Sequence, residues 1–349
     1  MSEKQKVPLR TKIIRVILFA GTAISMFFVP WPILWMWVQP LPDTIQEQLE
    51  LATEHGFDGI IVYVDQAGQE PGFYAAGWHN KEKQIPANPH AIFKIASITK
   101  LYDAVAITKL VHEGKLSLDG TLAEYFPELK DRIQYADQIT LRLMVQHRSG
   151  IPNFTDTYNY WVAPKETSDE NLALVLDKPA SFKPGEGYEY SNTNYLLIGR
   201  LIQKVTGGDK FEYIRQKILE PLGLKNTFAS IYDVDIEEVM SGYYVGYPDD
   251  LKTNDVGGIF LASAEDVGRF LRALNDGSVF EEGEQEIYSS IYQYDHTGLI
   301  PGYQSIARYH ADIDAVVIQF TNTVDFQGYT WDISVINYNR VVKTLRRQK

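Results

Sequence analysis

Residues 93–100 of the 349-residue sequence read Phe93-Lys94-Ile95-Ala96-Ser97-Ile98-Thr99-Lys100. From Ile98 to Val111, apolar residues recur three and four positions apart, which predicts a helix that ends near Gly114. Lys100 then lies one turn after Ser97 on the same face of this helix. A serine hydroxyl is a poor nucleophile until a neighbour takes its proton, and a lysine amine can do so. Ser97 at a helix start can equally serve only as an N-cap, so the motif needs support from the rest of the chain.

Two later segments supply that support. Tyr190-Ser191-Asn192 follows a turn-forming segment, so its side chains can project from a loop into a cleft. There the tyrosine hydroxyl can carry a proton, and the asparagine amide can donate a hydrogen bond to a substrate carbonyl. His296-Thr297-Gly298 precedes strand-like residues, and its glycine would let a substrate backbone pass close to the strand. Each segment is common by itself, but the three in this order predict a serine enzyme of acyl transfer.

Other catalytic classes lack their sequence signals. The chain has no Gly-x-Ser-x-Gly segment, which disfavours the nucleophile turn of an α/β-hydrolase. Its seven histidines show neither His-x-His nor His-Glu-x-x-His spacing, and it has no cysteine, so a zinc site or a thiol nucleophile is disfavoured. No phosphate-binding loop or dinucleotide fingerprint occurs. We therefore expect neither a cofactor nor a catalytic metal.

The composition is that of a folded, acidic protein. Apolar residues make up 45% and charged residues 22% of the chain, which is ordinary for a globular protein. Five of the first 15 residues are basic, whereas the remainder holds 28 basic and 44 acidic residues. Such an acidic body offers no basic stripe to a phosphate backbone, so we expect no nucleic-acid partner.

Residues 16–38 contain no charged side chain. As a helix they would be about 34 Å long, enough to cross a hydrocarbon core of about 30 Å, so we expect a transmembrane anchor here. A cleaved signal peptide is the alternative, but its apolar region is usually shorter and is followed by a small-residue cleavage site. The only cluster of small residues, at 20–23, lies inside the apolar run.

The flanks of this segment predict its orientation. The basic residues 1–15 should remain in the cytoplasm as a tail, and the prolines at 30 and 32 should end or kink the helix near the outer face. Three tryptophans gather at that far end, as in an interfacial aromatic belt: Trp31, Trp35 and Trp37. We expect a single-pass protein of the cell membrane. A linker at 39–45 would lead to a domain at 46–349 on the outer side.

The rest of the chain alternates between strand and helix patterns. The predicted strands are 59–64, 72–78, 305–309 and 315–322. The predicted helices are 98–111, 141–146, 171–176, 195–206, 264–274 and 333–345. This distribution predicts a sheet built from both ends of the domain, with a mostly helical insertion at about 115–250.

With these motifs, the chain from about Gln46 to Arg340 resembles the serine β-lactamase-related family, which includes class C β-lactamases, D-alanyl-D-alanine carboxypeptidases and related esterases and peptidases. The further segments that carry the resemblance are Gly114-Lys115-Leu116-Ser117-Leu118-Asp119, His147-Arg148-Ser149-Gly150-Ile151-Pro152, Pro221-Leu222-Gly223-Leu224, Gly257-Gly258, Ser263-Ala264-Glu265-Asp266 and Pro301-Gly302-Tyr303. Each segment is short, but their conjunction is specific.

The resemblance implies an α+β fold of the β-lactamase/transpeptidase type. Helices would flank an antiparallel sheet, and the active site would lie where a helical domain meets that sheet. Ser97 would be the acylated nucleophile, with Lys100 and Tyr190 sharing the acid and base work. Which of the two takes the serine proton stays open.

The resemblance also implies the groups that hold the substrate, which are Asn192, His296, Thr297, Gly298 and Leu299. Asn192 would orient the substrate amide, and the strand with His296 and Thr297 would hold the substrate's carboxylate or tail. The backbone amides of Ser97 and Leu299 would form the oxyanion hole.

One position departs from the class C pattern, because His296 stands where those enzymes usually carry lysine. A histidine is largely neutral at pH 7 unless a partner raises its pKa, so it attracts a carboxylate less. We therefore expect a peptidase or esterase rather than a strong β-lactamase. Its substrate would be an ester, a D-amino-acid peptide or a β-lactam-like molecule, with cell-wall peptide as one candidate. The alternative is an inactive penicillin-binding or sensing module of the same fold, and the complete catalytic set favours the enzyme.

Overall fold

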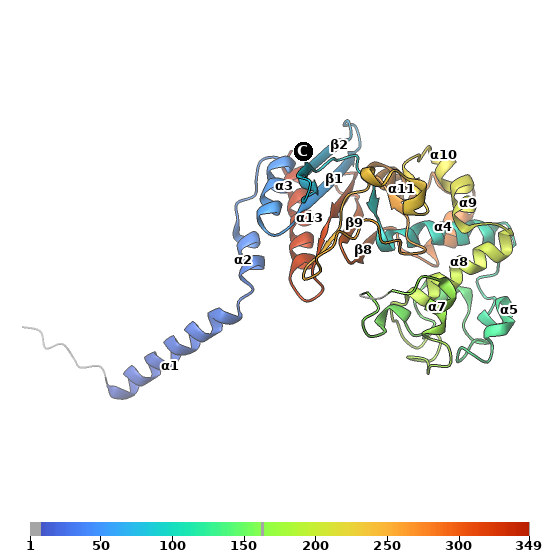
Figure 1. The fold of residues 1–349 in the computed structure, drawn as a ribbon, viewed down its shortest axis with the longest axis horizontal. Helices are drawn as coiled ribbons and strands as arrows, with labels where there is room; N and C mark the ends of the chain where they lie inside the picture. Colours follow the sequence, from blue (N-terminus) through green and yellow to red (C-terminus); the bar gives the residue numbers. More distant parts are fainter. Residues whose placement is uncertain (1–7, 162–163, 349) are drawn as a thin grey trace, which may run out of the picture.

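The computed structural model describes residues 8–161 and 164–348 (Figure 1). Its α-helices are α1 (Leu9–Ser25), α2 (Trp31–Val38), α3 (Ile45–Glu54), α4 (Thr99–His112), α5 (Leu122–Tyr125), α6 (Leu141–Val145), α7 (Ser168–Ala173), α8 (Asn192–Thr206), α9 (Lys210–Ile214), α10 (Glu220–Leu222), α11 (Ala264–Asp276), α12 (Glu284–Ser289) and α13 (Thr330–Arg347). The 3₁₀ helices used below are η1 (Met26–Phe28), η2 (Ala96–Ile98) and η4 (Phe154–Asp156).

The strands are β1 (Gly59–Gln66), β2 (Gly72–Asn80), β3 (Ile85–Pro86), β4 (Phe93–Lys94), β5 (Thr227–Phe228), β6 (Tyr243–Tyr244), β7 (Leu261–Ala262), β8 (His296–Ile300), β9 (Tyr303–His310), β10 (Ala315–Thr321) and β11 (Thr323–Val324). The central sheet has the order β3-β2-β1-β10-β9-β8, and all of its neighbouring strands are antiparallel. Early and late strands therefore pair at its centre, as the sequence predicted, and β8 forms one edge. Strands β4, β7 and β5 form a small second sheet.

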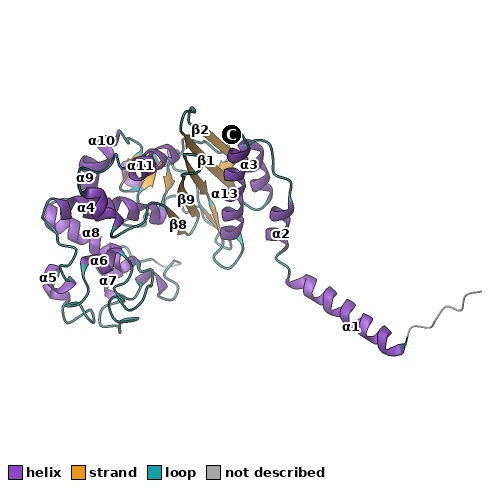
Figure 2. Ribbon diagram, turned by 180° about the vertical axis from the view of Figure 1, so that it is seen from behind, coloured by secondary structure: helices purple, strands orange, loops and turns teal. Residues whose placement is uncertain are grey.

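Both faces of the central sheet are covered by helices. Ile60 and Val62 of β1 pack with residues of α3 and α13, whereas Ile61 and Tyr63 belong to the core of the helical region. Figures 1 and 2 show the sheet between these two groups of helices. Because successive side chains point to opposite faces and both faces are buried, β1 is an uninterrupted apolar run.

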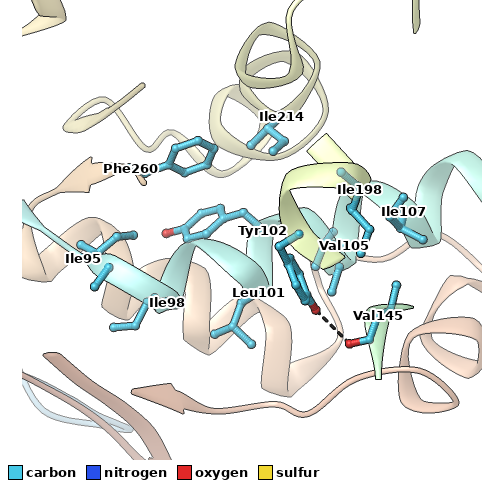
Figure 3. Packing of buried hydrophobic residues seen from close by; sticks show 14 of the residues in the cluster. Ile95, Ile98, Leu101, Tyr102, Val105, Ile107, Val145, Ile198, Ile214 and Phe260 are labelled. Carbon is cyan, nitrogen blue, oxygen red and sulfur yellow. Dashed lines mark hydrogen bonds between the residues drawn. The ribbon is translucent and has the colours of Figure 1, made fainter. Parts of the chain in front are cut away.

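Helix α4 lies at the centre of the helical region. Its residues from Thr99 to Leu110 are all buried, so it is covered on every side. The ring of Tyr102 stacks on Phe270 with 3.7 Å between centroids, and it also contacts Phe260 (Figure 3). This packing fixes the direction of the N-terminal end of α4, where Ser97 lies.

Each predicted helix and strand has an observed counterpart, but α3, α9 and α12 were not predicted, and three helix starts differ. Helices α7, α8 and α13 begin at 168, 192 and 330, each three residues earlier than predicted. At α7 the cause is visible, because Thr167 and Glu170 form a capping box. Polar residues in the first turn of a helix do not contribute to an apolar pattern. The predicted start of the helix therefore falls at its second turn. The predicted helical insertion is present, although its last part also contributes β5 and β6 to sheets.

The N-terminal apolar segment is not one helix over 16–38. Helix α1 ends at Ser25, η1 follows, and the chain turns at Val29 and Pro30 before α2 begins. Proline lacks the N–H that a continuing helix needs, so the predicted interruption occurs. Among the residues described, Leu9–Phe28 is the one helical stretch that is long and apolar enough to cross a membrane.

The structure also differs from the predicted ends of this apolar segment. Residues 1–7 of the predicted tail lie outside the described part of the chain, and its other basic residues, Arg10, Lys12 and Arg15, belong to α1. At the other end, Met36 of α2 is fully buried in the cluster that contains Val341 of α13. Helix α2 is therefore packed on the domain and does not continue a membrane span.

A buried arginine holds the segment that follows α2. Arg340 of α13 donates from Nη1 to the Gln39 carbonyl at 2.9 Å and from Nη2 to the Pro40 carbonyl at 2.6 Å. Its Nε donates to Gln48 Oε1 at 2.8 Å. Hydrogen bonds from a charged donor are stronger than neutral ones, so the predicted linker is held firmly against the domain.

We predict that Arg340→Leu lowers the free energy of unfolding by about 2 kcal/mol, because the hydrogen bonds of the buried guanidinium to Gln48 and to the partly exposed carbonyls of Gln39 and Pro40 are lost. Urea denaturation of the full chain in detergent measures this change. The matched control is Arg346→Leu, whose ion pair with Asp312 is about half exposed. That pair should contribute less than about 1 kcal/mol. Equal losses in the two variants would contradict the role assigned to Arg340.

Candidate active site

Ser97 lies in a strained turn between a strand and a buried helix. After β4 the chain enters η2, which leads directly into α4. Ala96, the residue before Ser97, has a φ of +51°, in the left-handed region that alanine seldom adopts. The Ile95 N–H donates to the Phe260 carbonyl at 3.1 Å, and Ser305 Oγ donates to the Ile95 carbonyl at 2.9 Å. These contacts from two other segments hold the turn in place.

The other two predicted catalytic residues both lie within hydrogen-bond distance of Ser97 Oγ. Tyr190 Oη lies 2.7 Å from Ser97 Oγ, and Lys100 Nζ lies 3.1 Å from the same oxygen. Lys100 also donates to Asn192 Oδ1 at 2.8 Å. The arrangement is that of a hydroxyl nucleophile flanked by two groups that can exchange its proton.

Lys100 is enclosed by aromatic rings, and none of the described ion pairs includes it. Its Nζ lies 5.0 Å from the ring centroid of Tyr190 and 5.3 Å from that of Tyr195, which favours a cation at this place. Asp103, one turn further along the same face of α4, pairs instead with Lys210 at 2.8 Å. The hydrogen-bond partners of Lys100 Nζ are therefore the neutral oxygens of Ser97 and Asn192.

The loop that carries Tyr190 is supported by His147. Their rings stack with 4.3 Å between centroids, and His147 Nδ1 accepts a hydrogen bond from the Ser191 N–H at 3.1 Å. Burial, followed by the charges of Lys100 and His296, lowers the pKa of His147 to about 3, so the ring is neutral at pH 7. The segment around His147 contributed to the family resemblance without a role, and the structure gives it one.

Asn192 is the first residue of α8 and does not project from a loop as predicted. Its N–H donates to Asn153 Oδ1 at 3.0 Å, and its Nδ2 donates to Thr155 Oγ1 at 3.1 Å. Since Lys100 donates to its side-chain oxygen, the network assigns the orientation of the amide. Asn153 and Thr155 were not predicted, because no periodicity marks η4 and its neighbours.

Strand β8 lies closer to the turn of Ser97 than a side chain at position 298 would allow. A Cβ on Gly298 would lie 2.5 Å from the Ile95 carbonyl oxygen and 2.8 Å from Ala96 Cβ. The expected reason for this glycine was the passage of a substrate backbone. The structure gives a different reason, which is the close approach of the protein's own turn.

His296 is buried and does not line the cavity beside Ser97. Its Nδ1 donates to the Thr297 carbonyl at 2.5 Å, and its Nε2 accepts from Tyr292 Oη at 2.9 Å. Burial, and then the charge of Lys100, lower the pKa of His296 to about 4. The ring is therefore neutral at pH 7, as the sequence suggested.

Strand β8 borders the cavity with its last residues, and its substrate-holding role stays a prediction. The residues of β8 that line the cavity are Leu299 and Ile300. His296, Thr297 and Gly298 do not line it, because the cavity lies beside the C-terminal end of this strand.

A cavity of about 330 Å³ opens beside Ser97. The predicted residues that line it are Ser97, Lys100, Tyr190, Asn192 and Leu299. The lining residues that were not predicted include Phe154, Thr155, Tyr160, Trp161, Leu196 and Val256. Tyr160 is only 7% exposed, so it belongs to the core and to the cavity wall at once. A cavity of this size accommodates a small molecule or the end of a peptide.

One group of described side chains is close enough to share a metal ion, namely His112, Glu281 and Glu284. Glu284 already accepts a hydrogen bond from Lys109 Nζ at 2.7 Å, and both side chains are buried. An ammonium group in that contact would repel a cation. None of these residues lines the cavity, and we assign them a structural ion pair.

Residues 41–290 match the sequence model of the family described as Beta-lactamase. The chain belongs to the beta-lactamase family. It is 26% identical over 272 residues to protein flp of Staphylococcus aureus, which covers 74% of this chain and 53% of that protein. It is 30% identical over 151 residues to a putative D-alanyl-D-alanine carboxypeptidase of Salmonella agona, which covers 41% of this chain and 35% of that protein. The chain thus spans about half the length of the first of these curated relatives.

Solved structures agree with this assignment. D-amino acid amidase from Ochrobactrum anthropi, complexed with D-phenylalanine, superposes with a TM-score of 0.77 at 23% identity, covering 87% of this chain and 98% of that one. A penicillin binding protein from Bacillus halodurans gives a TM-score of 0.70 at 20% identity, covering 83% and 97%. At these identities the likeness establishes the fold. The predicted α+β fold of the β-lactamase/transpeptidase type is therefore confirmed, and so is the predicted membership of the β-lactamase-related family.

We predict that Gly298→Ala lowers the free energy of unfolding by about 1–3 kcal/mol, because the new methyl group overlaps the Ile95 carbonyl. The same displacement should slow the reaction of Ser97 with an activated ester. Urea denaturation and the rate of ester hydrolysis measure the two effects. In the control Gly208→Ala, the added Cβ has no atom within 4 Å, so both values should stay at those of the wild type.

We predict that acid destabilises the fold partly through His147 and His296. Their folded-state pKa values, about 3 and about 4, lie below the unfolded value of 6.5, so the unfolded chain binds more protons. Their contribution to stability is complete above pH 6.5 and is lost as the pH falls toward these values, by about 1.4 kcal/mol per pH unit for each ring. Urea titrations between pH 7 and 4.5 should therefore show a steeper decline for wild type than for His296→Asn or His147→Asn. Equal slopes would argue against neutral, buried rings.

Proposed function

We propose that this protein is a hydrolase that works through an acyl-enzyme on Ser97. The observation that carries this proposal is the pair of contacts at Ser97 Oγ, 2.7 Å to Tyr190 Oη and 3.1 Å to Lys100 Nζ. A serine that only capped α4 would need neither neighbour. The cavity beside it supplies room for a substrate.

In the first step, Ser97 Oγ attacks the carbonyl carbon of an ester or amide. The serine proton passes to Lys100 as the free amine or to Tyr190 as the phenolate, since both contact the same oxygen. The carbonyl π bond opens to an oxyanion. The bond to the leaving alcohol or amine then breaks, and that group takes up the transferred proton.

Two backbone N–H groups are suited to hold the oxyanion. Ser97 lies at the start of α4, and Leu299 lies on edge strand β8, which contacts η2. We propose their amides as the oxyanion hole, a contact whose loss typically costs about 3 kcal/mol of transition-state stabilisation. Water then attacks the acyl carbon, loses a proton to the same base, and releases the acid while Ser97 recovers its hydrogen.

The substrate class we favour is an ester or a D-amino-acid peptide or amide. The two lines of support are the relatives named for D-amino-acid chemistry and the neutral state of His296. A neutral, buried histidine attracts the carboxylate of a β-lactam less than a lysine would, so strong β-lactamase activity is disfavoured. Cell-wall peptide, which ends in D-amino acids, is a natural candidate.

We further propose that α1 is a membrane anchor. No residue of Leu9–Phe28 is buried in the structure, and at 1.5 Å per residue this stretch is about 30 Å long, with Arg10, Lys12 and Arg15 near one end, from where long basic side chains reach the membrane surface. The basic side chains in its first two turns favour a cytoplasmic N-terminal end. The hydrolase domain would then face the outside of the cell, where cell-wall peptide occurs.

The experiment that tests the catalytic proposal is intact-protein mass spectrometry. The full chain in detergent is incubated with an activated D-amino-acid ester and, separately, with benzylpenicillin. We predict a mass increase equal to the acyl group with the ester, followed by its loss as water attacks. Ser97→Ala should show no increase, and Lys100→Met should slow acylation by at least about 10²-fold.

The control is Ser289→Ala, a surface position whose hydroxyl contacts only the Glu286 carbonyl. It should be acylated like the wild type. Equal labelling of wild type and Ser97→Ala would contradict the proposal. A stable penicillin adduct without any turnover of the ester would favour the penicillin-binding or sensing module instead.

A further inference from the structure

Helix α2 is apolar on every side, yet only one side is covered. Its sequence is Trp31-Pro32-Ile33-Leu34-Trp35-Met36-Trp37-Val38. Met36 is fully buried and Ile33 is partly buried against the cluster that includes α13. At 100° per residue the opposite side carries the positions i, i+3, i+4 and i+7. These four residues form the exposed stripe and are 39–60% exposed: Trp31, Leu34, Trp35 and Val38. Trp37, beside the stripe, is 71% exposed.

The start of α2 is tied to the end of the apolar stretch before it. Only Val29 and Pro30 separate η1 from α2, so α2 begins within about 11 Å of that end. Trp31 Nε1 also donates to the Met26 carbonyl at 3.0 Å, which fixes the corner. If α1 crosses a bilayer, α2 must begin at the bilayer surface.

The end of α2 is tied to the domain. The two carbonyls that follow it, those of Gln39 and Pro40, accept hydrogen bonds from buried Arg340. Gln48 continues this network by donating to Asn337 Oδ1 at 2.8 Å. Helix α2 therefore moves with α13 and the sheet, and it is not a loose tether between membrane and domain.

The chemistry of the exposed stripe favours lipid over protein. A helix of eight residues is about 12 Å long, and four side chains cannot supply the roughly 800 Å² per partner of a typical stable interface. The helix has no polar or charged side chain that could orient a second copy. Tryptophan, in contrast, is enriched where a bilayer meets water, and apolar helix faces lie in that layer.

We propose that the exposed stripe of α2 lies in the interfacial layer of the bilayer that α1 spans, and that it holds the hydrolase domain against the membrane in one orientation. This inference rests on the anchoring role proposed above for α1. Helix α2 packs on α13, and the central sheet separates α13 from the helical region with the Ser97 cavity (Figures 1 and 2). The substrate would therefore reach Ser97 from the aqueous side and not from the lipid.

The chain has no cysteine, so single-cysteine variants can be labelled at one chosen site. The full chain is reconstituted in vesicles of phosphatidylethanolamine and phosphatidylglycerol, with a nitroxide on Trp35→Cys or Val38→Cys. Tyr232→Cys, at an 83% exposed position of the domain, is the water-exposed control. Ile17→Cys, in α1, reports membrane insertion. Electron paramagnetic resonance then measures collisions of each label with oxygen, which enters lipid, and with a nickel chelate, which stays in water.

We expect the ratio of oxygen to nickel collisions at 35 and 38 to exceed that of the Tyr232→Cys control severalfold. A ratio equal to the control would overturn the proposal. Low collision rates with both reagents, together with dipolar broadening between labels, would mean that a second copy covers the stripe and would overturn it too. Wild-type urea midpoints for the labelled variants show that the fold is intact.

The Ile17→Cys label distinguishes a failure of the α2 inference from a failure of the α1 anchoring proposal on which it rests. If position 17 is lipid-exposed while 35 and 38 are water-exposed, α1 is an anchor and the surface role of α2 is wrong. If position 17 is also water-exposed, the anchoring proposal fails and the inference fails with it. Hydrolysis by Ser97 is untouched by either result.

Discussion

The close approach of edge strand β8 to the turn of Ser97 is the contact on which the site depends. It exists because Gly298 has no side chain, since a Cβ there would overlap the Ile95 carbonyl. Ser305, on the neighbouring strand, donates to that same carbonyl. The sheet and the helical region are thereby joined at the nucleophile itself. The left-handed conformation of Ala96 is tolerated because both sides of the turn are fixed.

The second half of the site comes from the helical region, and its polar groups are held by one another. His147 supports the Tyr190 loop, Thr155 and Lys100 hold the two ends of the Asn192 amide, and Asn153 holds its backbone. The two histidines are neutral mainly because they are buried, and the charge of Lys100 lowers their pKa values further. Lys100 is thus the one amine that contacts Ser97 Oγ in this network.

The two faces of the central sheet are covered by different parts of the chain. The face of the sheet toward the helical region carries the cavity, whereas the other face carries α3, α13 and the attached α2. A charged donor, Arg340, is buried there among backbone and amide oxygens. This holds the extended segment against the domain, because hydrogen bonds from a charged donor are stronger than neutral ones. Any contact of α2 with a membrane would therefore orient the whole domain.

From the residues alone, β1, β10, α4 and α13 could be placed, and Ser97, Lys100 and Tyr190 could be selected, because apolar periodicity and short motifs are local signals. The break at Pro30 was likewise local. Only the tertiary structure decided that Thr155 and His147 hold the site, that Gly298 makes room for the protein's own turn, and that α2 packs on α13. Each of these depends on a surface formed by residues distant in the chain, and no local pattern records such a contact.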